Sequence, residues 1–106
     1  MGPSLQDVWE ALKAYLLALG DDVQMKELEH YVAFRRLKNF ACVKALHNAL
    51  QVWTRLDPSS VEMQEGFTRD VTHIGHLGTG NLEIRIETGA ELEKAKPLLL
   101  RSYQEN

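Results

Sequence analysis

The spacing of hydrophobic residues at the start of the chain predicts an amphipathic helix. Apolar side chains recur at intervals of three and four residues, which places them on one side of a helix. They are Leu5, Val8, Trp9, Leu12, Tyr15, Leu16 and Leu19. Ser4 with Asp7 three residues later resembles a capping box, and Gly20 is expected to end the helix.

A second amphipathic helix is predicted near the end of the chain. Its apolar stripe consists of Leu92, Ala95, Leu99 and Tyr103. Thr88 and Glu91 have the spacing of a capping box at its start. Pro97 lies beyond the first turn, where it lacks a backbone donor and its ring clashes with the preceding turn. We therefore expect a kink at Pro97, or a short helix that restarts after it.

Between these helices the hydrophobic pattern changes to the alternation that is typical of strands. Four short runs are rich in aromatic and β-branched residues and are separated by turn residues. The runs are 31–37 (YVAFRRL), 39–46 (NFACVKAL), 49–56 (ALQVWTRL) and 81–87 (NLEIRIE). Lys38-Asn39 and His47-Asn48 are the expected turns, so the first three strands form a meander of two hairpins.

These elements predict an α+β fold with the order α-β-β-β-β-α. A small antiparallel sheet of about four strands is flanked by an N-terminal and a C-terminal helix. The 106 residues suit a single domain, 1–106, with one main core.

Trp53 is the most informative residue of the third predicted strand. If Leu50, Val52, Thr54 and Leu56 face the core, then Gln51, Trp53 and Arg55 point outward. An exposed tryptophan beside an arginine is a platform on which single-stranded nucleic acid stacks. Alternatively, a C-terminal segment covers Trp53 and forms a second small core. The second interpretation is favoured, because a sheet that is apolar on both faces is commonly covered on both.

The net charge of −3 conceals an uneven distribution of charge along the chain. Residues 1–30 carry six acids against two bases, and residues 57–106 carry nine acids against five bases. Residues 31–56 contain no acid. Their bases are Arg35, Arg36, Lys38, Lys44 and Arg55. A basic band of this kind is an electrostatic footprint for nucleic acid if folding gathers the side chains on one face.

Composition excludes several classes of protein. The chain is 44% hydrophobic and 25% charged, as is usual for a globular domain. The single cysteine, Cys42, excludes an internal disulfide and a thiolate-cluster zinc site. No apolar run is long enough to cross a membrane, and the start lacks the pattern of a secretory signal. We therefore expect a cytoplasmic protein without cofactors that does not bind a membrane.

The segment FTRDVTHIGHLGTGN, residues 67–81, contains the main candidates for catalytic or ligand-binding residues. They are Arg69, Asp70, His73, His76, Gly78 and Gly80. Two histidines and Asp70 offer no obvious further ligand for zinc, so no metal is predicted. Thr72 and Thr79 do not lie in a triad or nucleophile-elbow motif, so no catalytic residue is assigned. The GTGN run lacks the Lys-Ser/Thr of a phosphate-binding loop.

A structural role is the favoured interpretation of this segment. Glycines at positions 75, 78 and 80 would supply positive φ angles. Phe67, Val71 and Ile74 would anchor the segment to the core, and Asp70 or His76 would bind its backbone.

Several motifs resemble the bacterial family called domain of unknown function 5655. They are ALGDDV, YVAFRRLKNFACVKA, EGFTRDVTHIGHLGTGNLEIRI and LEKAKPLLLRSY, which lie between about residues 10 and 104. The resemblance implies a C-terminal module of so-called predicted transport proteins and of restriction-type nuclease proteins of phage defence. That family usually has an aromatic residue at the position of Leu77. It has no established catalytic residues, so the resemblance implies none in this chain. A fainter similarity, in NFACVKA, TRLDP and LLLRSY, is to the MmcQ/YjbR-like fold, a small antiparallel sheet with helices.

Two functions remain open at this point. The first is a non-catalytic accessory module that binds nucleic acid in a bacterial defence or restriction protein. It would use the basic residues of 31–56 on phosphates and Trp53 for stacking. The second is a protein-interaction or dimerisation module that binds another protein, or a domain of the same chain. A weaker third alternative is an enzyme centred on Arg69, Asp70, His73 and His76.

Overall fold

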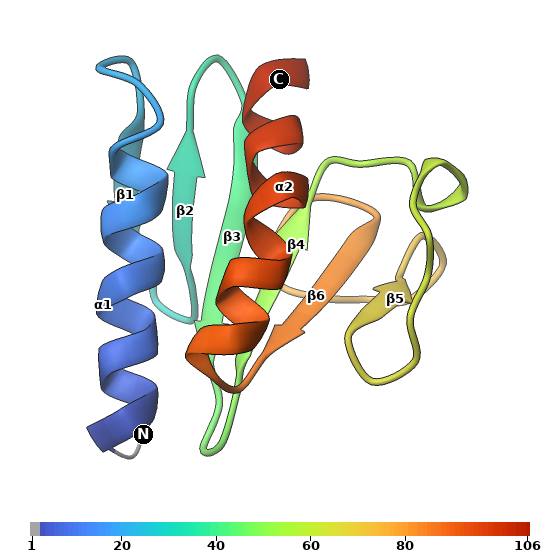
Figure 1. The fold of residues 1–106 in the computed structure, drawn as a ribbon. Coiled ribbons are helices and arrows are strands. Elements are labelled where there is room, and N and C mark those ends of the chain that lie inside the picture. The colour runs from blue at the N-terminus through green and yellow to red at the C-terminus, as the bar shows by residue number, and fades with distance from the viewer. Residues whose placement is uncertain (1–2) are drawn as a thin grey trace.

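The computed structural model describes residues 3–106 and shows an α+β fold (Figure 1). The elements in chain order are α1 (Pro3–Leu17), β1 (Gln24–Glu27), β2 (Val32–Arg35), β3 (Asn39–Ala45), β4 (Leu50–Thr54), a 3-10 helix (Pro58–Ser60), β5 (Thr68–Asp70), β6 (Leu82–Ile86) and α2 (Gly89–Glu105). The predicted fold class, an antiparallel sheet flanked by an N-terminal and a C-terminal helix, is confirmed.

The sheet has six strands rather than about four, in the order β1-β2-β3-β4-β6-β5. Every neighbouring pair is antiparallel. All four side chains of β1 are exposed, so this strand has no hydrophobic alternation that would reveal it. β5 has only three residues. The predicted meander is confirmed as β2-β3-β4, and its second turn is closed by the bond from Leu46 N to Ala49 O.

Both helices pack on the same face of the sheet, α1 over β1 and β2 and α2 over the middle of the sheet, where it contacts β3 and β6 (Figure 1). The main core lies between the two layers. Its most deeply buried large side chains include Leu12 and Leu16 of α1, Leu99 of α2, and Phe34, Phe40, Val52 and Ile84 of the sheet. The apolar stripes predicted for both helices therefore supply this core. Among residues 3–106, no helix is long and apolar enough to span a membrane.

The ends of the helices differ in part from the prediction. α1 begins at Pro3, which suits the first helical turn, so Ser4 lies inside the helix rather than capping it. At the start of α2 the predicted capping box is present in a shifted form, because Glu91 reaches the N–H of the residue before the N-cap Thr88. Thr88 Oγ1 accepts from Glu91 N at 3.2 Å, and Glu91 Oε1 accepts from the backbone N–H of Glu87 at 2.7 Å.

The expected restart at Pro97 is wrong, because α2 is continuous from Gly89 to Glu105. Pro97 is exposed, so its ring lies on the side of α2 that faces away from the core. Leu92, Ala95 and Leu99 are buried on either side of it. Packing of this apolar side holds the helix together through the proline.

Candidate functional site

The face of the sheet opposite the helices carries a row of five residues that the strand register places side by side. Ala33 pairs with Cys42, Cys42 with Trp53, Trp53 with Glu83, and Glu83 with Arg69. Residues at paired positions point to the same face of a sheet. Trp53 therefore points away from the helices, as predicted.

Trp53 is nevertheless only 2% exposed, so it is not an open stacking platform. It forms a second small core with Ala33, Cys42 and Val71, against which Tyr31 packs. The covering segment is the connection between β5 and β6, which crosses behind the sheet in Figure 1. The prediction of a covered tryptophan is confirmed, but the prediction that a C-terminal segment covers it is wrong. That segment is α2, whose apolar stripe belongs to the main core.

His76 and Gly78 make the closest contacts between this connection and Trp53. The imidazole of His76 stacks on the indole, with ring centroids 5.3 Å apart and an interplanar angle of 16°. A Cβ atom at Gly78 would lie 2.5 Å from Cε3 of Trp53 and 2.6 Å from Cβ of Cys42. Gly78 is therefore required by close packing, and its φ is not positive.

The remaining expectations for the segment are met in part. Of the three glycines, only Gly80 has a positive φ, of 124°. Val71 is buried as predicted, whereas Ile74 is 46% exposed and is not an anchor. Asp70 binds the backbone, because its Oδ1 accepts from Thr72 N at 2.9 Å, and its bonds to Thr72 lower the pKa of Asp70. The segment is thus a structured cover.

Glu83 is the polar centre of the helix-free face. Its side chain is only 10% exposed, and its Oε1 accepts from Trp53 Nε1 at 3.1 Å. Arg69 binds the same carboxylate, with NH2 3.2 Å from Oε1 and Nε 3.2 Å from Oε2. Gln51 Nε2 lies 3.5 Å from Oε1. Glu83 therefore fixes the plane of the indole and holds a partly exposed guanidinium beside it.

Two hollows adjoin this centre and share Gln51, Arg69 and Glu83. The first, of about 170 Å³, lies between Lys44 and the connection and is also lined by Trp53, Gly75, His76 and Leu77. The second, of about 360 Å³, extends toward β5 and is also lined by Glu65, Gly66, Phe67, Thr68 and Arg85. Together they form a shallow groove across β4, β6 and β5 with cationic side chains along it.

The predicted basic residues do not all meet on one face. Lys44 lines the first hollow, and Arg35 follows Ala33 by two positions and so points to the helix-free side. The guanidinium of Arg55 donates to Asn39 O at 2.8 Å, at the end of the β2-β3 hairpin. Lys38 is exposed in that hairpin turn. The predicted basic residues therefore do not form one cluster: Lys44 lies beside the first hollow, whereas Lys38 and Arg55 lie at the β2-β3 hairpin.

Arg36 is bound on the side of the helices and is not available to the groove. Its Nε lies 2.9 Å from Asp22 Oδ2, and its guanidinium lies over the ring of Tyr103 at 4.9 Å. The hydroxyl of Tyr103 donates to Asp22 Oδ1 at 2.8 Å. Asp22 thus joins the turn after α1 to the hairpin and to α2.

This triad predicts a pH dependence of stability. The hydrogen bond from Tyr103 lowers the pKa of Asp22, and Arg36 acts in the same direction. Because the folded pKa is below the unfolded one, the stabilisation is present above the unfolded pKa, about 3.9, and is lost as pH falls through the folded pKa. We expect the free energy of unfolding, measured with urea, to fall less for Asp22→Asn than for the wild type when the pH is lowered from about 5 to about 2. Equal losses in both proteins would contradict this assignment.

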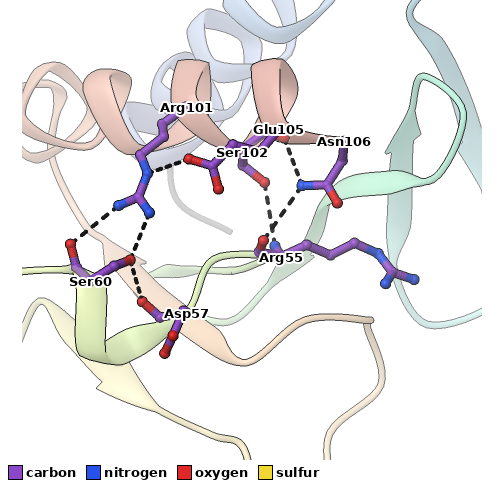
Figure 2. A network of polar contacts seen from close by, with 7 residues as sticks. All are labelled: Arg55, Asp57, Ser60, Arg101, Ser102, Glu105 and Asn106. Atoms are coloured by element: carbon purple, nitrogen blue, oxygen red, sulfur yellow. Dashed lines mark hydrogen bonds and ion pairs between the residues drawn. The ribbon is translucent and has the colours of Figure 1, made fainter.

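A second polar network joins the C-terminal end of α2 to the connection after β4 (Figure 2). Arg101 NH2 donates to Ser60 Oγ at 2.7 Å, and Ser60 Oγ donates to Asp57 O at 2.6 Å. Asn106 Nδ2 donates to Ser102 O at 2.9 Å. A polar hollow of about 650 Å³ lies nearby, lined by Arg55, Leu56, Asp57, Pro58, Thr72, Thr79, Gly80, Asn81 and Asn106. The side chains of this network bind one another, which is typical of a structural junction.

Within the described residues there is no group of three His, Cys, Asp or Glu side chains that could hold a metal ion. His73 is exposed, and His76 lies on Trp53. Gln51, Glu83 and Arg85 are site residues that the sequence pattern does not predict. Their outward positions in 49–56 and 81–87 were predicted, but these two segments are far apart in the chain and the alternation does not show that they pair.

The class of protein defined by these observations is a small α+β domain, with helices on one face of an antiparallel sheet and a glycine-rich cover on the other. The chain belongs to the family described as domain of unknown function (DUF5655), whose model matches residues 2–106. An uncharacterized protein of Haemophilus influenzae is 26% identical over 101 residues, which cover 95% of this chain and 33% of that protein. The chain thus spans about one third of the length of this relative. No solved structure matches the chain.

Proposed function

We propose that the domain is a non-catalytic accessory module that binds nucleic acid through the helix-free face of its sheet. The observation that carries the proposal is the register, which assigns five cations to this face. They are Lys26, Arg35, Lys44, Arg69 and Arg85. Glu83 and Glu87 also point to the helix-free face, and they are bound by Arg69 and Arg85, respectively. Glu65 also lines the second hollow, and the cations still outnumber the acids. This surplus of positive charge suits a phosphate backbone.

Lys44 is the residue on which the proposal can be tested most directly. It is partly buried beside the first hollow and makes no ion pair with another described residue. Its removal therefore leaves the Glu83 centre intact. Lys13 on α1 is a matched control, because it has the same charge, pairs with Glu10 and lies on the opposite side of the sheet.

We expect Lys44→Ala to weaken binding of a fluorescent single-stranded oligonucleotide several-fold. Anisotropy titrations over a range of salt concentrations should show the slope of log K against log salt reduced by roughly 0.7, since one phosphate contact is lost. Lys13→Ala should bind like the wild type. Binding that does not depend on salt, or equal effects of the two variants, would refute the proposed face.

The length of the relative suits an accessory role, since the matched part is only one third of that protein. We extend the proposal to a module of a longer bacterial defence or restriction protein. In that setting the domain would add affinity for the nucleic acid on which another part of the chain acts. Salt-dependent binding by the isolated domain is what this role requires.

A protein-interaction module is the second candidate function, and β1 favours it. Among the described residues this strand pairs only with β2, and its outer edge has backbone groups that a further strand can bind. Met25 and Leu28, in and next to β1, are 38% and 37% exposed. Under this alternative the oligonucleotide titration gives no response. The domain instead sediments as a dimer, or as a complex with a partner protein, and β1 forms the contact.

A further inference from the structure

The contact between His76 and Trp53 has the geometry of a stacked nucleobase. The two rings are nearly parallel, at 16°, with centroids 5.3 Å apart. Proteins that bind single strands use this arrangement of a flat ring on tryptophan for successive bases, because every base has a π face. His76 therefore occupies the place that a base would take on this indole.

The imidazole of His76 is held by stacking and not by a hydrogen bond at Nδ1 to a described residue. Its Nδ1 is buried and, within residues 3–106, has no hydrogen-bond partner. Buried polar atoms without partners are unfavourable, so moving the imidazole into water offsets part of the stacking that it loses. The backbone is held next to it, because Gly78 packs against the indole, but the side chains of Ile74 and Leu77 are 46% and 42% exposed and do not cover the imidazole.

Trp53, in contrast, is fixed in place. The indole N–H donates to Glu83, and Gly78 packs against the ring at Cε3. The indole would therefore keep its position when His76 leaves. A fixed aromatic floor, covered by a single imidazole whose Nδ1 has no partner among the described residues, is what an exchangeable stacking site needs.

Groups suited to the rest of a nucleotide surround the same place. The hollow of about 170 Å³ beside the imidazole is lined by both Trp53 and His76. Lys44 and Arg69 also line this hollow, and the Arg69 side chain remains 56% exposed although it pairs with Glu83. Both are cations of the kind that bind phosphate oxygens. The amide of Gln51 also lines it and has the donor and acceptor that a base edge requires.

We propose that Trp53 is the floor of a base-stacking subsite for single-stranded nucleic acid, and that an unpaired base binds there by displacing His76. The inference rests on the proposed function, and it specifies single strands because a base within a duplex is already stacked on its neighbours. Lys44 and Arg69 bind the flanking phosphates.

The test uses the fluorescence of Trp53. Because the chain has two tryptophans, Trp9→Phe leaves Trp53 as the only one. The protein is titrated with an oligothymidylate and with an abasic oligonucleotide of the same length and charge. We expect the oligothymidylate to quench Trp53 emission and to bind roughly five-fold or more tightly than the abasic strand.

Removal of the cover provides the second measurement. His76→Ala should tighten oligothymidylate binding several-fold and leave abasic binding unchanged. His73→Ala, in the same segment but exposed, is the matched control and should change neither.

The outcomes separate the subsite from the proposed function. Equal, salt-dependent binding of both strands with unchanged emission would overturn the subsite and leave the phosphate-binding face standing. Binding of neither strand would overturn both. Weaker oligothymidylate binding by His76→Ala would show that His76 is a contact rather than a cover, and it would overturn the displacement.

Discussion

Replacement of Gly80 by alanine is expected to lower the free energy of unfolding by about 3 kcal/mol or more. Two independent effects combine at this position. The φ of Gly80 is 124°, a region that residues with a side chain rarely adopt. A Cβ atom there would also lie 2.2 Å from the carbonyl oxygen of Thr54, which is backbone at the end of β4 and has no rotamer with which to move away.

Two other glycines of the chain separate these effects. Gly66 has a φ of 80° but nothing within 4 Å of an added Cβ, so Gly66→Ala should cost only about 1–2 kcal/mol. Gly75 has neither a positive φ nor a close neighbour, so Gly75→Ala should be neutral or stabilising by up to about 1 kcal/mol. Urea unfolding of the three variants should give the order Gly80, Gly66, Gly75 from largest to smallest loss. Similar losses of unfolding free energy in Gly80→Ala and Gly75→Ala would contradict the backbone conformation and close contact described for Gly80.

Ser102→Ala is expected to destabilise the protein by about 2–4 kcal/mol, although it removes a single oxygen atom. Ser102 is completely buried on α2. Its Oγ donates to Phe40 O at 2.6 Å and accepts from Arg55 N at 3.3 Å, the second of which is drawn in Figure 2. Without the hydroxyl, a buried carbonyl of β3 and the N–H after β4 both lose their partner.

Ser4→Ala is the matched control, because it is the same change in the other helix at an exposed position. It should alter the unfolding free energy by less than about 0.5 kcal/mol. Thermal and urea unfolding, followed by circular dichroism, measure both variants under one set of conditions. Equal stability of Ser102→Ala and Ser4→Ala would show that α2 is not tied to the sheet through this hydroxyl.

The elements that the sequence predicts correctly are those that carry their own hydrophobic pattern. The stripes of α1 and α2 and the alternation in 81–87 arise because one side of each element is buried against the other layer. β1 has no buried side chain, and β5 has only three residues, of which one is buried, so neither strand has a hydrophobic alternation of its own and each is defined mainly by pairing with a neighbour. Pairing partners are not encoded in local periodicity, which is why both strands were missed.

The candidate site was predicted in part for a similar reason. Alternation showed that Trp53 points away from the core formed with the helices, and the glycines indicated an unusual backbone after β5. Neither pattern reveals that the connection folds back onto the indole, because Trp53 and His76 are distant in the chain. The role of Glu83 was invisible for the same reason, since its partners Trp53, Gln51 and Arg69 come from two other strands.

The fold class, the apolar faces of both helices and the outward direction of Trp53 can be predicted from local patterns, because each follows from the period of one pattern. The packing of distant segments shows which segment covers Trp53, that Arg36 is bound by Asp22 while Lys44 lies beside the groove, and that Gly78 and Gly80 are required by close contacts. Those features depend on distances between segments far apart in the chain. Such distances are set by the packing of the whole core and not by the residues on either side of each position.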